Sequence, residues 1–174
     1  MKICIMGPSG AGKTTLSKQL ATALSLPVYP FDAIYWDMTG DEFHKNSEDF
    51  ITSQVNAIKE TDKCIVEGAY DKRLLPFLND CTVIFRIDIP YWKRVNYLIK
   101  RLFINRIKRQ LPKETLVNTW ELLRFSKQYN KRLDVFFNNH PELSSKVIVI
   151  HDISLCVEIC NKQLENKKSL NNFV

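Results

Sequence analysis

The chain alternates short, continuous apolar runs with longer stretches in which apolar residues recur at helical spacing. The apolar runs predict strands at residues 2–6, 26–31, 64–66, 82–89 and 146–150. The longer stretches predict a helix that ends before Pro27, helices at 47–59, 74–78, 91–110 and 113–138, and a last helix from Asp152. Strands that are apolar throughout and alternate with helices are typical of a parallel sheet covered on both faces. The pattern therefore predicts an α/β fold with a five-stranded parallel sheet.

The first predicted strand runs directly into Gly-Pro-Ser-Gly-Ala-Gly-Lys-Thr at residues 7–14, and a helix follows. This octet matches the P-loop pattern G-x-x-x-x-G-K-[ST] at every fixed position. Glycines let the backbone amides turn toward phosphate oxygens at the positive end of a helix. We expect Lys13 to reach the β- and γ-phosphates and the Thr14 hydroxyl to bind Mg²⁺. The predicted nucleotide-binding residues are Gly7, Pro8, Ser9, Gly10, Ala11, Gly12, Lys13, Thr14 and Thr15.

Three carboxylates, Asp32, Glu67 and Asp88, also follow or end predicted strands. In a parallel sheet these strand ends meet at one edge, where ligands bind. Asp32 is the candidate for holding an acceptor hydroxyl or taking its proton, with a helix cap as the alternative. Glu67 is the candidate for a metal-bound water, with an ordinary strand-end acid as the alternative. We expect Asp88 to cap the next helix.

Length and composition predict one domain over residues 1–174 of ordinary globular type. No apolar stretch approaches the roughly 20 residues needed to cross a bilayer, so no membrane partner is expected. The five cysteines are odd in number and scattered through apolar runs, which favours reduced thiols in a cytoplasmic protein. Composition leaves open whether the chain is a monomer or a dimer.

The net charge of +6 is unevenly distributed, because residues 91–132 hold twelve Lys/Arg and two acidic residues, whereas 32–62 hold eight acidic residues and two lysines. Phosphoryl transfer needs cations that close over the γ-phosphate. We therefore predict a mobile, lid-like basic segment at about 91–115 in which Arg94 and Arg101, seven residues apart, serve catalysis. Residues Tyr91, Val95, Leu98, Leu102 and Phe103 are expected to pack the opposite helix face.

Two alternatives remain for the basic segment: a solvated helix, or a surface that binds DNA. Interleaved basic and aromatic residues permit nucleic-acid binding. The aromatic residues Tyr97, Phe103, Trp120 and Phe125 recur at helical spacing, which favours the core instead. A DNA partner therefore stays open but is not the favoured interpretation.

The whole chain resembles the adenylate kinase-like P-loop proteins of the DNA topology modulation (FlaR-type) family. The resemblance is carried by residues 7–14, 28–36, 65–70 and 87–90, by the series Arg94, Arg101 and Arg106, and by the stretch 120–132. It implies ATP binding, Mg²⁺ and a three-layer kinase fold of the nucleoside/shikimate kinase type. ATP and GTP are not distinguished by these residues.

The chain departs from nucleoside monophosphate kinases on the acceptor side. Residues 32–62 contain no arginine, and Asp71 stands where such kinases carry one. An acidic acceptor side repels a phosphate monoester unless Arg73 or Arg86 compensates. We therefore predict a small-molecule kinase whose acceptor carries a hydroxyl or amine and no phosphate. The alternatives are an ATP-dependent DNA-associated protein, an adenylate-type kinase and a nucleotide-dependent switch.

Overall fold

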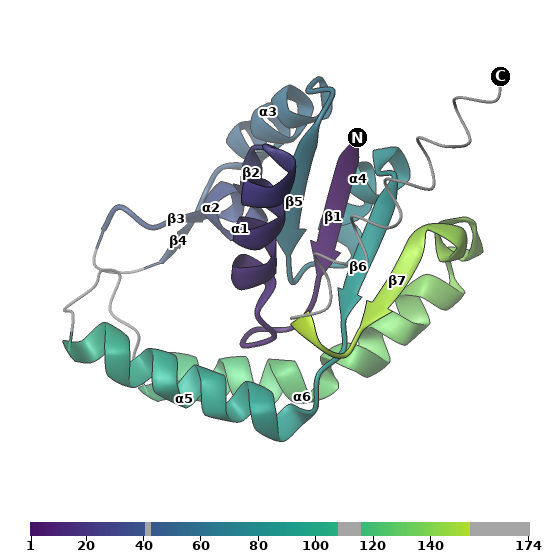
Figure 1. Ribbon diagram of the computed structural model, residues 1–174. Helices are drawn as coiled ribbons and strands as arrows, with labels where there is room; N and C mark the ends of the chain where they lie inside the picture. The colour runs from purple at the N-terminus through teal and green to yellow at the C-terminus, as the bar shows by residue number, and fades with distance from the viewer. Residues whose placement is uncertain (41–42, 108–115, 154–174) are drawn as a thin grey trace, which may run out of the picture.

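A computed structural model describes residues 1–40, 43–107 and 116–153, and its centre is a five-stranded parallel sheet. The strands are β1 (Lys2–Met6), β2 (Val28–Pro30), β5 (Cys64–Gly68), β6 (Val83–Ile87) and β7 (Val147–Ile150). Their order across the sheet is β2-β5-β1-β6-β7, so β1 is central and hydrogen bonded to β5 and β6 (Figure 1). The loop after β1 therefore emerges where the strand order reverses, which is where parallel sheets bind ligands. The predicted α/β fold and sheet are confirmed.

Helices cover both faces of the sheet, which gives three layers (Figure 1). They are α1 (Lys13–Leu24), α2 (Phe31–Tyr35), α3 (Glu48–Lys59), α4 (Leu75–Asp80), α5 (Tyr91–Ile107) and α6 (Leu116–Asn138), with 3₁₀ turns at Lys72–Leu74 and Pro141–Lys146. Alternation along β1 divides the core: Ile3 and Ile5 pack with α1, whereas Cys4 and Met6 pack with residues of α3, α4 and α6. The helix predicted from Asp152 lies outside the described residues beyond Ile153.

The segment after β2 differs from the sequence prediction. The strand expected at 26–31 is only Val28–Pro30, and the chain turns at once into α2. A short antiparallel pair follows, formed by β3 (Trp36–Asp37) and β4 (His44–Lys45). The predicted start of α3 is confirmed, because the Ser47 hydroxyl accepts a hydrogen bond from the Phe50 amide at 3.2 Å.

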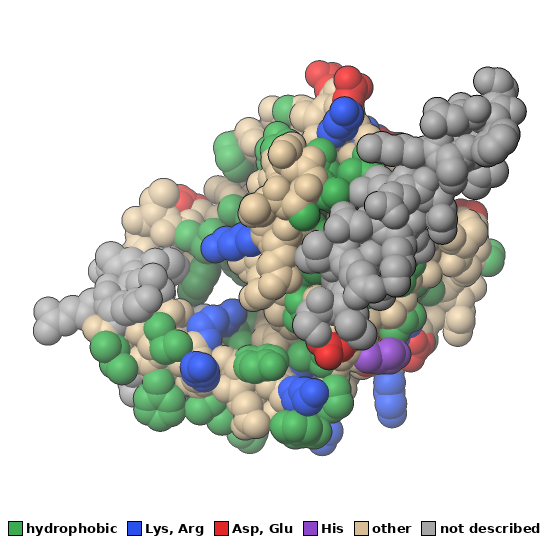
Figure 2. Space-filling model, in the orientation of Figure 1, with side chains coloured by type: hydrophobic (Ala, Val, Ile, Leu, Met, Phe, Trp, Pro, Cys, Tyr) green, Lys and Arg blue, Asp and Glu red, His purple; other side chains and the backbone are tan. Residues whose placement is uncertain are grey.

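Helix α5 buries Leu98 and Leu102 as expected, but it also buries Arg94 and leaves Phe103 exposed. Arg94, Leu98 and Leu102 are 4%, 1% and 6% exposed, whereas Phe103 is 60% exposed. The aromatic residues expected in the core are also largely outside, with Tyr97 52% and Trp120 71% exposed. The expectation is wrong for Tyr97, Phe103 and Trp120, whereas half-buried Phe125 packs against the core. On α5 the buried stripe follows i, i+4, i+8 spacing from Arg94, and a helical period alone does not show which stripe faces the core. Basic and hydrophobic side chains interleave on the outer surface of α5 (Figure 2).

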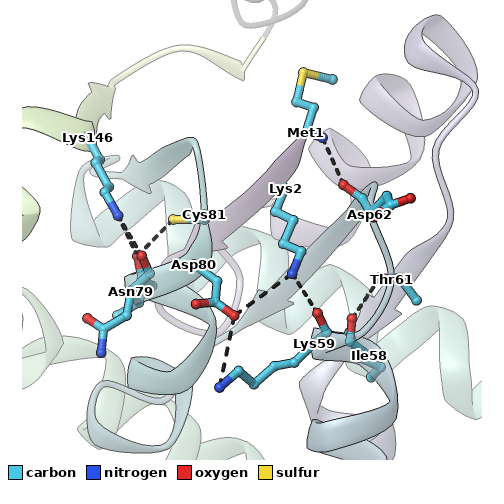
Figure 3. Close-up of polar contacts among 11 residues, drawn as sticks. Met1, Lys2, Ile58, Lys59, Thr61, Asp62, Asn79, Asp80, Cys81 and Lys146 are labelled. Atoms are coloured by element: carbon cyan, nitrogen blue, oxygen red, sulfur yellow. Dashed lines mark hydrogen bonds and ion pairs between the residues drawn. The ribbon is translucent and has the colours of Figure 1, made fainter.

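The opposite end of the sheet, where the strands begin, is fixed by polar contacts to backbone carbonyls (Figure 3). The N-terminal amine donates to the Asp62 carbonyl at 2.9 Å and Lys2 donates to the Lys59 carbonyl at 2.6 Å. Buried thiols line this end, and burial raises the pKa of Cys4 above its usual range and that of Cys81 to about 11. These thiols are therefore protonated and unreactive at neutral pH. Within the described ranges, none of the helices has the length and apolar character to cross a bilayer.

Candidate active site

Residues 7–12 form the loop between β1 and α1, as the motif predicts. Gly10 and Gly12 have φ values of +78° and +88°, in the left-handed region that only glycine adopts without strain. The Pro8 carbonyl accepts a hydrogen bond from the Ala11 amide at 3.1 Å and so closes the loop on itself. The loop leads into the first turn of α1, where Thr14 and Thr15 are exposed. This backbone supports the binding of phosphate at a helix N-terminus.

Helix α5 lies directly against this loop at Gly10. A Cβ added to Gly10 would be 2.8 Å from the Arg94 carbonyl oxygen and 2.9 Å from Leu98 Cγ. The first of these atoms belongs to the backbone, so no side-chain rotation removes the clash. The lack of a side chain at Gly10 therefore allows both the loop geometry and its close approach to α5.

Replacing Gly10 by alanine is expected to lower the free energy of unfolding by about 1–3 kcal/mol and to weaken binding of ATP·Mg²⁺. The methyl group would occupy a left-handed backbone position and collide with α5. Urea denaturation and titration calorimetry measure the two effects. The control is Gln19→Ala, at an exposed position of α1, and equal stability and affinity in the two variants would contradict this account of Gly10.

The Lys13 side chain is buried inside the loop, at 8% exposure, and its ammonium donates to the Pro8 carbonyl at 3.3 Å. Burial lowers the pKa of Lys13, the nearby carboxylates of Glu67 and Asp32 raise it, and the charge of Arg101 lowers it. Lys13 is thus the meeting point of residues from the ends of β2 and β5 and from α5. An ammonium held under the loop is placed to neutralise phosphate charge.

The hydroxyl of Thr14 and the carboxylate of Glu67 form a pair at the edge of the sheet. Thr14 Oγ1 donates to Glu67 Oε1 at 2.8 Å, and Glu67 is 4% exposed at the end of β5. Because the Thr14 hydroxyl is the donor in this hydrogen bond, the lone pairs of its oxygen stay free to bind a cation. Mg²⁺ prefers such oxygen ligands. The two side chains therefore fit the predicted magnesium position, with Glu67 acting beside Thr14. In the described part of the chain, no three His, Cys, Asp or Glu residues form a ready metal cluster.

Replacing Glu67 by glutamine is expected to stabilise the nucleotide-free protein at neutral pH and to weaken Mg²⁺-dependent nucleotide binding. Burial raises the pKa of Glu67 from its usual 4.5, so the ionised carboxylate reduces the stability of the fold. The loss of stability is absent below pH 4.5, where the carboxyl is protonated in both the folded and the unfolded protein, and it is complete above the raised pKa. The stability advantage of the Glu67→Gln variant should therefore disappear in acid. Urea denaturation at pH 7.5 and pH 4 checks this, with Glu60→Gln, an exposed site, as the control. A variant that is less stable at pH 7.5 would show that the attraction of Lys13 outweighs burial.

Asp32 lies in the first turn of α2, exposed to solvent, and does not cap that helix, which begins after Pro30 without a side-chain cap. Its charge raises the pKa values of Glu67 and Tyr70, after the larger effect of burial in both cases. The Tyr70 hydroxyl in turn accepts a hydrogen bond from Trp36 Nε1 at 2.9 Å. Figure 2 shows the surface hollowed between α5 and the part of the molecule that carries β3 and β4. Asp32 and its aromatic neighbours thus lie next to the phosphate loop, as expected for an acceptor site.

The structure separates the two arginines predicted for catalysis. Arg94 is buried, and its Nη1 donates to the Ser126 carbonyl of α6 at 2.7 Å, so it has a structural contact between the two helices. Arg101 is exposed and close enough to Lys13 for its charge to lower the pKa of that lysine. The catalytic roles of both stay predictions, and Arg101 has the more suitable position. The lid-like segment is described only as far as Ile107, and residues 108–115 lie outside the described range.

Several polar contacts of this region could not be predicted from the sequence. Asp88 accepts a hydrogen bond from Asn130 of α6 at 2.6 Å, and its expected role as a helix cap stays a prediction. Asp71 pairs with Arg132 and Arg86 with Asp134, at 3.0 and 2.6 Å. Each pair joins residues more than 40 positions apart. Spacing along the chain predicts neighbours on one element, and it does not predict which charges meet across elements.

Comparison with protein families gives one match, to a model described as RNA helicase, over residues 3–81. The matched region contains the phosphate loop, Asp32 and Glu67, and it is less than half of the chain. The RNA helicase family is a P-loop type of family and differs from the FlaR-type family that the sequence resembles. Membership of the FlaR-type family therefore stays a prediction. No curated protein matches the chain.

Solved structures of P-loop kinases match almost the full length. Shikimate kinase from Bacteroides thetaiotaomicron is 19% identical with a TM-score of 0.60, over 95% of this chain and 98% of that one. Shikimate kinase from Acinetobacter baumannii in complex with shikimate is 20% identical with a TM-score of 0.59, over 95% and 94%. Deoxyadenosine kinase from M. mycoides with bound dATP is 16% identical with a TM-score of 0.54, over 95% and 100%. The chain therefore has the three-layer α/β fold of P-loop small-molecule kinases.

Proposed function

We propose that the protein is a kinase that transfers the γ-phosphoryl group of ATP to the hydroxyl of a small acceptor bound beside Asp32. The observation that carries this proposal is the convergence at Lys13. Lys13 lies under the phosphate loop, 3.3 Å from the Pro8 carbonyl, and next to Thr14, whose hydroxyl contacts Glu67 at 2.8 Å. The charges of Glu67, Asp32 and Arg101, from β5, α2 and α5, are close enough to shift the pKa of Lys13. The cation expected at the phosphates therefore lies beside both the expected metal position and the expected acceptor carboxylate. The kinase fold of the neighbouring solved structures supports the same interpretation.

In this mechanism the chain positions reactants and neutralises charge. Backbone amides of residues 7–12 and the ammonium of Lys13 hold the phosphates. Thr14 and Glu67 would hold Mg²⁺, which would withdraw charge from the phosphate oxygens. Asp32 orients the acceptor hydroxyl and accepts its proton. The acceptor oxygen bonds to the γ-phosphorus, the bond from that phosphorus to the bridging oxygen breaks, and ADP leaves with the electron pair. Arg101 stabilises the charge on the transferred group.

The experiment that tests the proposal measures ADP release from ATP·Mg²⁺ by the purified protein. It is run alone, with a panel of nucleosides, nucleotides and polar metabolites, and with plasmid DNA, beside a Lys13→Met variant. Stimulation by one small acceptor that is lost in the variant supports the kinase and identifies its substrate class. GTP in place of ATP decides the preferred donor. Release that no small molecule stimulates contradicts the proposal.

A second candidate function is association with nucleic acid through the outer face of α5. The observation in its favour is the exposure of Trp92, Tyr97 and Phe103, at 61%, 52% and 60%, on a helix that carries no acidic residue. Exposed aromatic rings among cations suit stacking of bases beside a phosphate backbone. Stimulation of ADP release by DNA alone, with a steep loss on adding salt, would favour this function over the kinase.

A further inference from the structure

Two cations beside the Tyr35 ring, on the acceptor side of the site, are paired with one carboxylate of α3. The Arg73 guanidinium lies 4.6 Å from the centre of the Tyr35 ring, and its Nη1 is 3.5 Å from Glu48 Oε2. Lys45 pairs with the other oxygen of Glu48, and its ammonium is 5.6 Å from the centre of the same ring. Glu48 and Tyr35 therefore hold both cations in place, on the surface that leads to Tyr70 and Asp32.

Two further arginines near these strand ends are also paired with carboxylates. Asp71 follows Tyr70 in the chain, and its Oδ2 is 3.0 Å from Arg132 Nη2. Arg86 Nη2 is 2.6 Å from Asp134 Oδ1. Of the two arginines that the sequence offered as compensation for the acidic acceptor side, Arg73 is thus paired with Glu48 and Arg86 with Asp134. In the ranges that the structure describes, Arg73, Arg86 and Arg132 thus each have an acidic partner before any substrate binds.

Apart from Lys13 and Arg101, which the proposed mechanism assigns to the donor phosphates, the charges beside Asp32 favour the exclusion of an anion. Lys13 lies under the phosphate loop and is occupied by the donor phosphates in the proposed mechanism. Asp32 is exposed beside it, and Tyr70 carries a raised pKa, mainly from burial and then from the charge of Asp32, so it stays an uncharged phenol. A phosphate monoester placed here would meet the exposed carboxylate of Asp32, while Arg73 and Arg132 already have carboxylate partners in Glu48 and Asp71. Like charges at close range disfavour binding unless a cation is released to meet them.

We propose that this site takes an alcohol that carries neither phosphate nor carboxylate, and that Glu48 enforces this choice by holding Arg73 against Tyr35. The inference rests on the proposed kinase function and adds its substrate class. Glu48 acts through Arg73 and is a positioning residue for specificity. Shikimate is itself a carboxylate, so the shared fold with shikimate kinases does not extend to the acceptor. A neutral nucleoside or sugar has the required chemistry.

The first test uses inorganic phosphate as the probe and Glu48→Gln as the variant, with the nucleotide site filled by a non-hydrolysable ATP analogue and Mg²⁺. The NMR signals of the Arg73 guanidinium report whether phosphate reaches it. We expect little response in the wild-type protein and a saturable response in Glu48→Gln, with affinity increased about fivefold. Equal responses in the two proteins would overturn the proposal.

Two further variants separate release of Arg73 from a general effect of charge. Asp49→Asn removes one negative charge from the same exposed turn of α3 and should leave phosphate affinity unchanged. Glu48→Gln combined with Arg73→Ala should lose the gained affinity, because the gain needs the released guanidinium. A gain that persists in the double variant contradicts the role of Arg73.

The second test compares phosphoryl transfer to deoxyadenosine and to its monophosphate, with shikimate and gluconate as carboxylate-bearing acceptors. The proposal expects transfer to the neutral member and a shift toward the monophosphate in Glu48→Gln. Faster transfer to the monophosphate by the wild-type protein would overturn the substrate class and leave the kinase function intact. Absence of Lys13-dependent transfer to every acceptor would instead remove the kinase function, while the phosphate titration still decides whether Glu48 restrains Arg73.

Discussion

Replacing Lys13 by methionine is expected to reduce phosphoryl transfer by about a thousandfold. The ammonium is the cation held within the phosphate loop, 3.3 Å from the Pro8 carbonyl. Methionine keeps most of the length and apolar contacts of the lysine stem and removes the ammonium, with its charge and its hydrogen bond to Pro8. Because a buried charge is costly, the variant should fold at least as well as the wild-type protein. Steady-state kinetics of ADP release measures the loss, and thermal denaturation verifies the fold.

The matched control for Lys13→Met is Lys18→Met, which makes the same chemical change at an exposed position of the same helix. It should retain activity and nucleotide affinity. If both variants behave alike, the phosphate loop does not bind the reacting nucleotide and the mechanism is wrong. Calorimetric titration with ATP·Mg²⁺ gives this answer even before an acceptor is known.

Replacing Asp32 by asparagine is expected to slow phosphoryl transfer by about a hundredfold to a thousandfold while nucleotide affinity stays nearly unchanged. The carboxylate is exposed in the first turn of α2, so its loss leaves no unpaired group in the core. Asparagine can still hold an acceptor hydroxyl, but it cannot take a proton. The loss should therefore appear in kcat and only weakly in the KM for ATP.

The control for Asp32→Asn is Asp37→Asn, five residues away in β3. The Asp37 carboxylate accepts hydrogen bonds from the amide and hydroxyl of Thr39, at 2.9 and 2.7 Å, and so has a local structural role. This variant should keep its kcat. An Asp32→Asn enzyme with normal kcat would assign Asp32 to structure and require another group to take the proton.

The features that local patterns determine were predictable from the sequence. The strands of the sheet are apolar on both faces, so each was visible as an unbroken run, and only their ends moved by a few residues. The phosphate loop was equally predictable, because the backbone conformation that requires its glycines is set within the same eight residues. The cap at Ser47 was visible for the same reason.

The features that depend on packing between distant elements were not predictable. Arg94 lies in a basic segment of the kind that forms a lid over phosphate. Its position in line with Leu98 and Leu102 nevertheless places it against α6. The outer aromatic residues of α5 had the same helical spacing as core residues, and only the arrangement of α5 beside α6 shows that Tyr97 and Phe103 are exposed. The pairing of Arg73 with Glu48 needs the turn after β5 to meet the start of α3, which no local pattern encodes.

The close contact between Gly10 and α5 links two parts of the molecule thermodynamically. Because the Arg94 carbonyl oxygen lies against Gly10, a movement of the phosphate loop toward α5 requires a displacement of the helix. The outer face of that helix is the surface formed by Trp92, Tyr97 and Phe103. If a partner on this surface displaces the helix and so changes the affinity for nucleotide, the nucleotide must change the affinity for the partner by the same factor. Helix α5 thus gives a bound nucleotide a physical route to the exterior of the protein.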